Sequence, residues 1–339
     1  MNVTTLGIDL AKNIFQLHGV NKEGVAVLTK KISRKKLPEF IIQLKPCLIG
    51  MEACGGSNYW GRKFRAMGHD VRLISPQFVK PYVKSNKNDA VDAEAICEAV
   101  ARPNMRFVAI KNIEQQDIQC VHRMRARFVK ERTALVNQTR GLLAEYGIVI
   151  AQGISHIRKQ LPLILEDAEN ELSILGRRLF NNLYEQLQDA DNKVQEYDLQ
   201  IKEYCQSNEI CKRLLKSPGV GVLIASAIVA SIGDATIFKN GREMAAFIGL
   251  VPKQYSSGGK QRLLGISKRG DRYLRCLLIH GARSALFRSK NLPKKQAEWL
   301  NSLIERRGRN RATVALANKN ARIMWALMTK GENFNATKI

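Results

Sequence analysis

The first hundred residues alternate between hydrophobic and polar positions in a way that predicts a sheet with interspersed helices. Residues 3–10 are predicted to form a strand. Residues 14–20 and 25–32 alternate on either side of the turn Asn21–Gly24, which is typical of a β-hairpin. The next segments switch between helical spacing and short apolar runs, and they lie at residues 34–44 (helix), 47–52 (strand), 58–67 (helix) and 71–74 (strand). A meander of three strands is therefore followed by alternating helices and strands.

Four carboxylates lie at the ends of these predicted elements. Asp9 ends the first strand in GIDLAK, and Glu52 ends the fourth in IGMEACGG. Asp89 and Asp92 lie three residues apart in KNDAVDAEAI, which puts both on one face of a following helix. This order of strands and helices is expected of an RNase H-like fold, and such a set of oxygen ligands suits Mg²⁺ (or Mn²⁺) in two-metal phosphodiester chemistry. The alternative is that Asp89 caps the helix and Asp92 is a solvated acid of its first turn.

The rest of the chain has helical spacing almost throughout. From about residue 113 to residue 211 apolar residues recur at steps of three, four and seven, which predicts long amphipathic helices that pair antiparallel or form a coiled coil between subunits. Helical patterns return at residues 273–287 and 314–328. We therefore predict an α/β domain (1–110), a helical coiled-coil spacer for dimerisation (111–210) and a mostly helical C-terminal domain (211–339).

Two glycines between helical patterns are candidate phosphate contacts. The segment SPGVG, which contains Gly219 and Gly221, resembles a helix-hairpin-helix turn. Backbone N–H groups at the start of a helix can hold a phosphate there without reading bases. The alternative is an ordinary tight connection between two helices.

A second candidate site is a basic stretch from residue 249 to residue 275. It places the adjacent hydroxyls of Ser256 and Ser257 beside Gly258 and Gly259. Its basic residues are candidate nucleic-acid contacts, namely Lys253, Lys260, Arg262, Lys268, Arg269, Arg272 and Arg275. The alternative is a basic flexible loop that only touches nucleic acid.

The composition of the chain indicates which kinds of molecule it could bind. The net charge of +25 and the pI near 10.0 predict a polyanionic partner, and nucleic acid is the first expectation. We expect neither a membrane span nor a signal peptide, because the chain has no run of eighteen apolar residues and no basic start followed by an apolar core. The seven cysteines contain no C-x-x-C pair and the five histidines are scattered, so we predict no metal or catalytic role for either type.

The ordered motifs together resemble a known family. GIDLAK, MEACGG, KNDAVDAEA, SPGVG and GLVP-x₄-SGG-x₆-ISKRG-x₃-LR occur in this order over nearly the whole chain. They resemble the DEDD transposases of the insertion-sequence 110 family, whose members have an N-terminal RuvC-like domain and a C-terminal transposase domain. The family's four acids fall onto Asp9, Glu52, Asp89 and Asp92. Its catalytic serine falls onto Ser257, with a second hydroxyl one residue away.

The resemblance implies an RNA-guided recombinase that works in a prokaryotic cytoplasm on nucleoid DNA. It implies DNA cleavage and rejoining through a serine-DNA covalent intermediate, with Mg²⁺ held by the carboxylates. A structured noncoding guide RNA would pair with double-stranded donor and target DNA, and the protein would be a homo-oligomer, either a dimer or a tetramer. Two alternatives stay open: a RuvC-like metal-dependent junction resolvase or nuclease that uses water as nucleophile, and a nonenzymatic nucleic-acid-binding protein.

Overall fold

The computed structural model describes residues 2–84, 89–288, 292, 294–331 and 334. The chain forms two compact units. The first comprises Met1–Gln116, Ile228–Phe247 and Ala321–Gly331, and the second comprises Asp117–Ala227, Ile248–Asn320 and Glu332–Ile339. In the described part of the chain, every helix is too short or too polar to cross a bilayer. The division into three domains stays a prediction.

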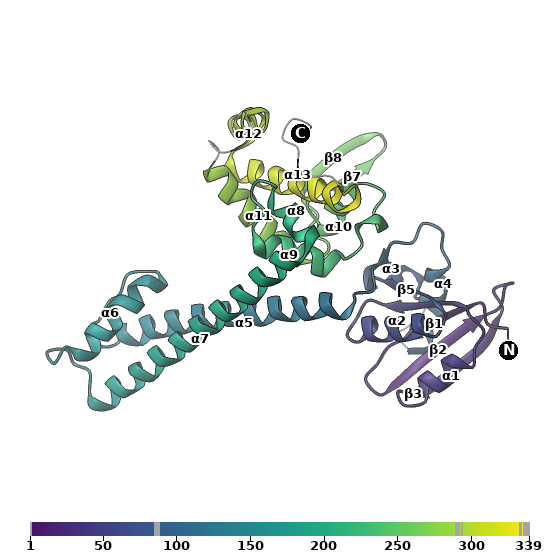
Figure 1. The fold of residues 1–339 in the computed structure, drawn as a ribbon, viewed down its shortest axis with the longest axis horizontal. Coiled ribbons are helices and arrows are strands. Elements are labelled where there is room, and N and C mark those ends of the chain that lie inside the picture. The colour runs from purple at the N-terminus through teal and green to yellow at the C-terminus, as the bar shows by residue number, and fades with distance from the viewer. Residues whose placement is uncertain (1, 85–88, 289–291, 293, 332–333, 335–339) are drawn as a thin grey trace. The chain divides into compact units, whose positions relative to one another are not determined.

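The first unit is built on a six-stranded mixed sheet (Figure 1). Its strands are β1 (Thr5–Asp9), β2 (Ile14–Val20), β3 (Ala26–Ser33), β4 (Leu48–Glu52), β5 (Asp70–Ile74) and β6 (Phe107–Val108). They are ordered β3-β2-β1-β4-β5-β6. Neighbours β1, β4 and β5 run parallel, whereas β2, β3 and β6 pair antiparallel with their neighbours. The predicted meander of three strands is confirmed, and the sequence pattern did not indicate β6.

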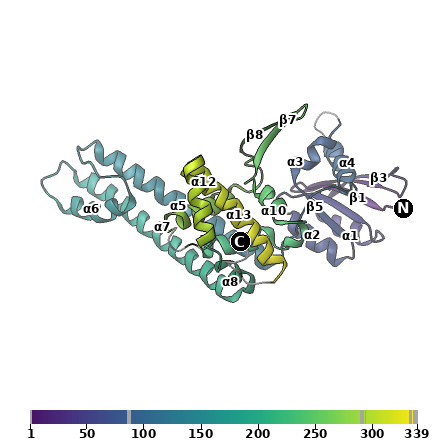
Figure 2. The ribbon, with the colours of Figure 1, turned by 90° about the horizontal axis from the view of Figure 1, so that it is seen from above.

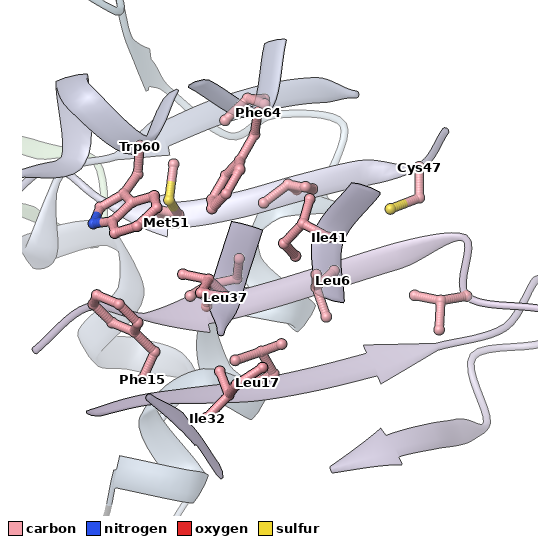
Figure 3. Close-up of a cluster of buried hydrophobic side chains, with 14 of the residues drawn as sticks. Leu6, Phe15, Leu17, Ile32, Leu37, Ile41, Cys47, Met51, Trp60 and Phe64 are labelled. Carbon is pink, nitrogen blue, oxygen red and sulfur yellow. The ribbon is translucent and has the colours of Figure 1, made fainter. Parts of the chain in front are cut away.

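One face of this sheet carries a large apolar cluster (Figure 3). Helices α1 (Leu37–Ile42) and α2 (Ser57–Ala66) supply apolar side chains that pack on the strands. The ring of Trp60 meets Phe15 edge-on at 5.3 Å between centroids and stacks on Phe64 at 5.4 Å. Because alternate residues of a strand point to opposite faces, this packing leaves the second face for other elements.

The second face is covered by α4 (Asp89–Val100), with α3 (Pro76–Val79) and the short 3₁₀ segment η1 (Lys80–Tyr82) beside it. Ile96 and Val100 of α4 are fully buried with Ile74 of β5 in a second apolar cluster. The first unit is therefore a mixed α/β structure with helices on both faces of the sheet, as the alternation of the sequence predicted.

The second unit contains two long helices, α5 (Ile113–Ala144) and α7 (Ile174–Ser207), with α6 (Ile154–Glu166) packed at one end. Most of α5 and all of α7 belong to this unit. They run antiparallel, because Arg125 pairs with Asp198 at 2.6 Å whereas Arg132, seven residues later, pairs with Asp191 at 3.1 Å. Figures 1 and 2 show the two helices side by side over part of their length. The expected long amphipathic helices are confirmed as an antiparallel pair within one chain.

The C-terminal region is mostly helical, as predicted, and contains one β-hairpin. Its helices are α8 (Glu209–Leu215), α9 (Val222–Ile232), α10 (Gly241–Ile248), α11 (Arg272–Phe287), α12 (Lys294–Arg307) and α13 (Arg309–Thr329), with a 3₁₀ turn η2 (Ala235–Ile237). The hairpin consists of β7 (Pro252–Ser257) and β8 (Lys260–Ile266). The sequence analysis had not predicted these two strands. Figure 2 shows the hairpin as a two-stranded arm that leaves the helices of the second unit.

Candidate active site

The ends of two adjacent parallel strands place the first two acids. Strand β1 pairs with β4 so that Gly7 lies opposite Gly50 and Ile8 lies opposite Met51. Asp9 and Glu52 come two residues after the paired glycines, so both side chains point to the face of the sheet that carries α4. Both are half-buried.

Two glycines let α4 lie directly on these strands. A Cβ atom at Gly7 would be 2.2 Å from the carbonyl oxygen of Ala93, and a Cβ at Gly50 would be 2.7 Å from the Cβ of Val100. Any larger residue at these positions would therefore hold the helix away from the sheet. Sequence reasoning missed this role, although the pattern Gly-x-acid occurs at the end of both strands.

The close packing of α4 brings three carboxylates together. One oxygen each of Asp9, Asp89 and Asp92 lies within 4.8 Å of the other two. The side chains come from the end of β1 and the first turn of α4, and Asp89 is exposed while the other two are half-buried. A set made only of carboxylate oxygens is what a hard divalent cation such as Mg²⁺ or Mn²⁺ prefers, so these residues fit the metal that the sequence indicated.

Glu52 is not one of these three residues, but it lies close to the same site. Burial raises the pKa of the Cys54 thiol, and the negative charges of Glu52 and then Asp9 raise it further. Both carboxylates therefore act on the same thiol, just beyond the end of β4. Cys54 is a neighbour of the site that sequence reasoning did not identify.

The hairpin β7–β8 separates the two candidate serines. Its two-residue turn consists of Gly258 and Gly259, with φ angles of +55° and +76° that match the turns favoured in tight hairpins. Ser257 lies opposite Lys260, and Tyr255 lies opposite Arg262. Directly opposite residues share a face of an antiparallel pair, so Ser257 belongs to a face with two cations and an aromatic ring.

Ser256 belongs to the other face of the hairpin. It lies opposite Gln261, and its Oγ accepts a hydrogen bond from Nε2 of Gln254 at 3.0 Å. Leu263 lies opposite Gln254 and shares this uncharged face. The register therefore distinguishes two serines that the sequence alone could not.

The base of the hairpin is anchored by backbone and side-chain contacts. The amide of Lys268, which has a φ of +54°, donates to the carbonyl oxygen of Gly249 at 3.1 Å. Arg275 of α11 is buried, and its Nη1 donates to the carbonyl oxygens of Ile248 at 2.9 Å and Arg269 at 3.2 Å. Arg275 thus binds the protein's own backbone. The other predicted phosphate contacts are exposed, namely Lys253, Lys260, Arg262, Lys268, Arg269 and Arg272.

The turn between α8 and α9 gives its two glycines different surroundings. Gly219 has a φ of +79°, and a Cβ there would be 2.8 Å from the carbonyl oxygen of Gly281 on α11. Gly221 faces open space at the start of α9. Gly219 therefore serves the close packing of the turn on α11, whereas Gly221 is placed where a ligand could approach.

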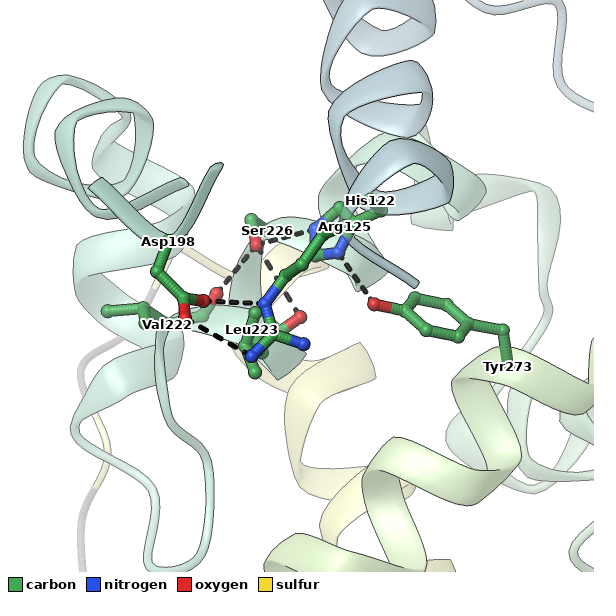
Figure 4. Close-up of polar contacts among 7 residues, drawn as sticks. All are labelled: His122, Arg125, Asp198, Val222, Leu223, Ser226 and Tyr273. Atoms are coloured by element: carbon green, nitrogen blue, oxygen red, sulfur yellow. Dashed lines mark hydrogen bonds and ion pairs between the residues drawn. The ribbon is translucent and has the colours of Figure 1, made fainter. Parts of the chain in front are cut away.

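A buried polar network holds the start of α11 in place (Figure 4). Nδ1 and Nε2 of His122 lie 2.9 Å from the hydroxyl of Tyr273 and from Oγ of Ser226, respectively. The Ser226 hydroxyl donates to the carbonyl oxygen of Val222 at 2.6 Å, so we assign Nε2–H as donor to Ser226 and the Tyr273 hydroxyl as donor to Nδ1. Burial, followed by the charge of Arg125, lowers the pKa of His122 to about 4, which keeps the ring neutral.

Comparisons with known proteins cover both candidate sites. The family described as "Transposase IS116/IS110/IS902 family" matches residues 211–298, and a second transposase profile, for the DEDD transposases of IS110, matches residues 6–148. The chain is 50% identical over 333 residues to the transposase for insertion sequence element IS1111A of Coxiella burnetii, covering 98% of this chain and 92% of that protein.

Two further relatives are similar over nearly their full length. A probable family 20 transposase of Pseudomonas aeruginosa is 47% identical over 97% of this chain and 98% of its own length. The transposase for insertion sequence element IS1328 of Yersinia enterocolitica is 42% identical over 98% of this chain and 99% of its own length. These similarities confirm the resemblance that the ordered motifs indicated.

Proposed function

Because this chain belongs to the IS116/IS110/IS902 family of insertion-sequence transposases, we propose that it cuts and rejoins DNA through a covalent bond between a DNA phosphate and Ser257. The observation that carries this proposal is the convergence of carboxylate oxygens from Asp9, Asp89 and Asp92 within 4.8 Å. The strand order and directions of the sheet also support an RNase H-like (RuvC-like) identity for the N-terminal domain.

The four acids would hold Mg²⁺ (or Mn²⁺), with Glu52 contributing from the strand next to Asp9. When bound, the metal would neutralise charge on the phosphoryl oxygens and lower the pKa of the attacking hydroxyl. Ser257 gives up its hydroxyl proton to solvent, its Oγ bonds to phosphorus, and the bond from phosphorus to the leaving deoxyribose oxygen breaks as that oxygen takes up a proton from solvent. In rejoining, a hydroxyl of the other DNA end attacks the phosphoserine ester and Ser257 regains its proton.

The face of the hairpin supports Ser257 as the nucleophile. Lys260 and Arg262 share this face and supply positive charge beside the attacked phosphate, whereas Ser256 is turned towards the uncharged face. Exposed cations at the base of the hairpin and the open backbone at Gly221 would contact DNA phosphates that lie further from the one that is cut.

We also propose that a structured RNA guides the protein and that it acts as a homo-oligomer. The net charge of +25 supports contacts to phosphates of DNA and RNA, which carry no sequence information, so base pairing would supply the specificity. Apolar side chains near the shared end of α5 and α7 support an interface between subunits. Val149, Ile174 and Leu175 are 84%, 89% and 55% exposed.

The experiment that tests the proposed function uses variants of both candidate sites, the carboxylates and the serine hairpin. The full-length protein is produced in cells together with the DNA that flanks its gene, copurifying RNA is sequenced, and covalent protein-DNA adducts are trapped with Mg²⁺ present. Wild type is compared with Ser257→Ala, with Ser256→Ala as the matched control on the other face of the hairpin, and with Asp92→Asn. We expect adducts and an enriched RNA with wild type and Ser256→Ala.

Three outcomes would contradict parts of the proposal. Cleavage that survives Ser257→Ala would identify a nuclease that uses water. Adducts that survive Asp92→Asn would remove the metal site from the reaction. If wild type binds DNA and RNA but yields neither cleavage nor adducts, the protein is a nonenzymatic nucleic-acid-binding protein.

A further inference from the structure

A small pocket extends from the carboxylates across the sheet. Its volume is about 270 Å³, and its lining includes Asp9, Asp89, Ala11, Asn13, Gln16 and Lys31. This volume is below the ~300–1,000 Å³ of pockets that enclose a whole small molecule, so it suits one unit of a longer chain. Carboxylates lie at one end, and an amide and a cation lie at the other.

The sheet register explains how these residues come to share the pocket. Asp9 of β1 lies opposite Gln16 of β2, and Gln16 lies opposite Lys31 of β3. Directly opposite residues point to the same face, so the three side chains form a row across three strands. Strands are about 4.8 Å apart, which places the backbone of Lys31 roughly 10 Å from that of Asp9. Lys31 is thus placed to meet a phosphate beside a metal-bound one.

The polar groups of Gln16 and Lys31 are available for a ligand. Within the described residues, Lys31 forms no ion pair and the side-chain amide of Gln16 forms no hydrogen bond. Lys30 precedes Lys31 in β3, and its side chain points to the opposite face of the sheet, away from this pocket. Its Nζ lies 4.5 Å from the centroid of the Phe40 ring.

We propose that Gln16 and Lys31 bind the backbone phosphate next to the one that is cut, on the strand held by the carboxylates. This inference rests on the proposed function, since the carboxylates must hold a metal and a DNA strand. The ammonium group of Lys31 supplies charge and three donors, and the amide of Gln16 supplies two neutral donors. An anionic strand would therefore run from the acidic end of the pocket, where a metal compensates the negative charge, to a basic end.

The test uses Lys31→Ala with Lys30→Ala as its matched control, because both remove one positive charge from adjacent positions of β3. The full-length proteins bind a labelled duplex from the DNA that flanks the gene, with Ca²⁺ replacing Mg²⁺, at several salt concentrations. Each phosphate contact contributes about 0.9 to the slope of log affinity against log salt. We expect Lys31→Ala to reduce the slope by about one and Lys30→Ala to leave it unchanged.

Two further variants test whether Lys31 acts through its charge and Gln16 through its neutral amide. Lys31→Arg keeps the charge and should restore the slope, while Gln16→Ala should weaken binding severalfold without changing the slope, because the amide is neutral. In the cleavage assay, Lys31→Ala should lower kcat/KM about tenfold relative to Lys30→Ala, mainly through KM.

The results separate this inference from the proposed function. If wild type cleaves DNA but Lys31→Ala and Lys30→Ala have the same slope and the same kcat/KM, the phosphate contact is wrong while the function stands. If no protein cleaves DNA but Lys31→Ala alone loses slope, Lys31 does contact a DNA phosphate, while the proposed function is wrong.

Discussion

Replacing Gly7 by alanine should damage the proposed metal site through packing alone. A Cβ atom there would lie 2.2 Å from the carbonyl oxygen of Ala93 and 2.5 Å from the backbone nitrogen of Cys97, whereas ordinary contacts begin at 3.4 Å. Helix α4 must therefore move away from β1 by about 1 Å, and overpacking of this kind typically costs ~1–3 kcal/mol. Both clashing atoms belong to the helix backbone, so no side-chain rotation relieves the contact.

The same movement acts on the carboxylates. Asp89 and Asp92 are on the first turn of α4, while Asp9 stays on the strand, so a shift of the helix separates the two sets of ligands. Catalytic and metal sites need their groups within about 0.5 Å of the working geometry, and a displacement of 1 Å can reduce the rate by about 100-fold. We expect Gly7→Ala to lose most of its metal affinity while it remains folded.

Thermal unfolding at increasing Mn²⁺ concentrations measures the loss of metal affinity directly. A ligand at 100 times its dissociation constant stabilises the folded state by ~2.7 kcal/mol, so the midpoint of wild type should rise with Mn²⁺ and that of Gly7→Ala should not. Gly55→Ala is the matched control, since a Cβ at Gly55 meets nothing within 4 Å. Equal Mn²⁺ stabilisation and equal cleavage rates in Gly7→Ala and Gly55→Ala would refute the reasoning.

The remaining predictions concern the second unit. Arg275→Ala should lower the free energy of unfolding by ~2–4 kcal/mol in chemical denaturation, because it leaves two backbone carbonyls without their charged donor; an unchanged value would contradict that role. The pKa of His122 falls from 6.5 to about 4, so its contribution of ~3 kcal/mol is fully present above pH 6.5 and is lost as the pH falls towards 4. Denaturation between pH 7.5 and 4.5 should show this loss in wild type and in His280→Gln, an exposed control, but not in His122→Gln. Ser257→Ala should abolish covalent adducts on gels without changing the unfolding midpoint, whereas Ser256→Ala should retain them.

The N-terminal sheet could be predicted because its strands bury one or two faces. Alternation along β2 and the apolar runs at β1 and β4 are direct consequences of that burial. Asp9 and Glu52 could be named for the same reason, since each ends a strand whose bounds the pattern gives, whereas Asp89 and Asp92 were named from their spacing on a predicted helix. The pattern does not show how closely α4 packs on the sheet. That distance depends on Gly7 and Gly50, which contact a helix more than forty residues away in sequence.

The hairpin and Arg275 could not be predicted, for opposite reasons. In β7 every residue is exposed, and in β8 all but the last residue are exposed, so neither strand has the buried face that produces a recognisable alternation. The two glycines of the turn were the available signal. Arg275 has the same chemistry as its neighbour Arg272, and only the fold makes one buried and the other exposed.

The hairpin β7–β8 has no buried face, so its residues can be changed without disturbing the folded core. Because no side chain of β7 contributes to a core, exchanging residues along the arm leaves the cohesion of the helices beneath it intact. If a change between Pro252 and Ser257 abolishes the proposed strand exchange, the defect can therefore be assigned to contacts with DNA and not to unfolding of the helices. The arm is also the natural place to graft a different sequence, since its anchor at Gly249 and Arg275 lies outside the exchanged segment.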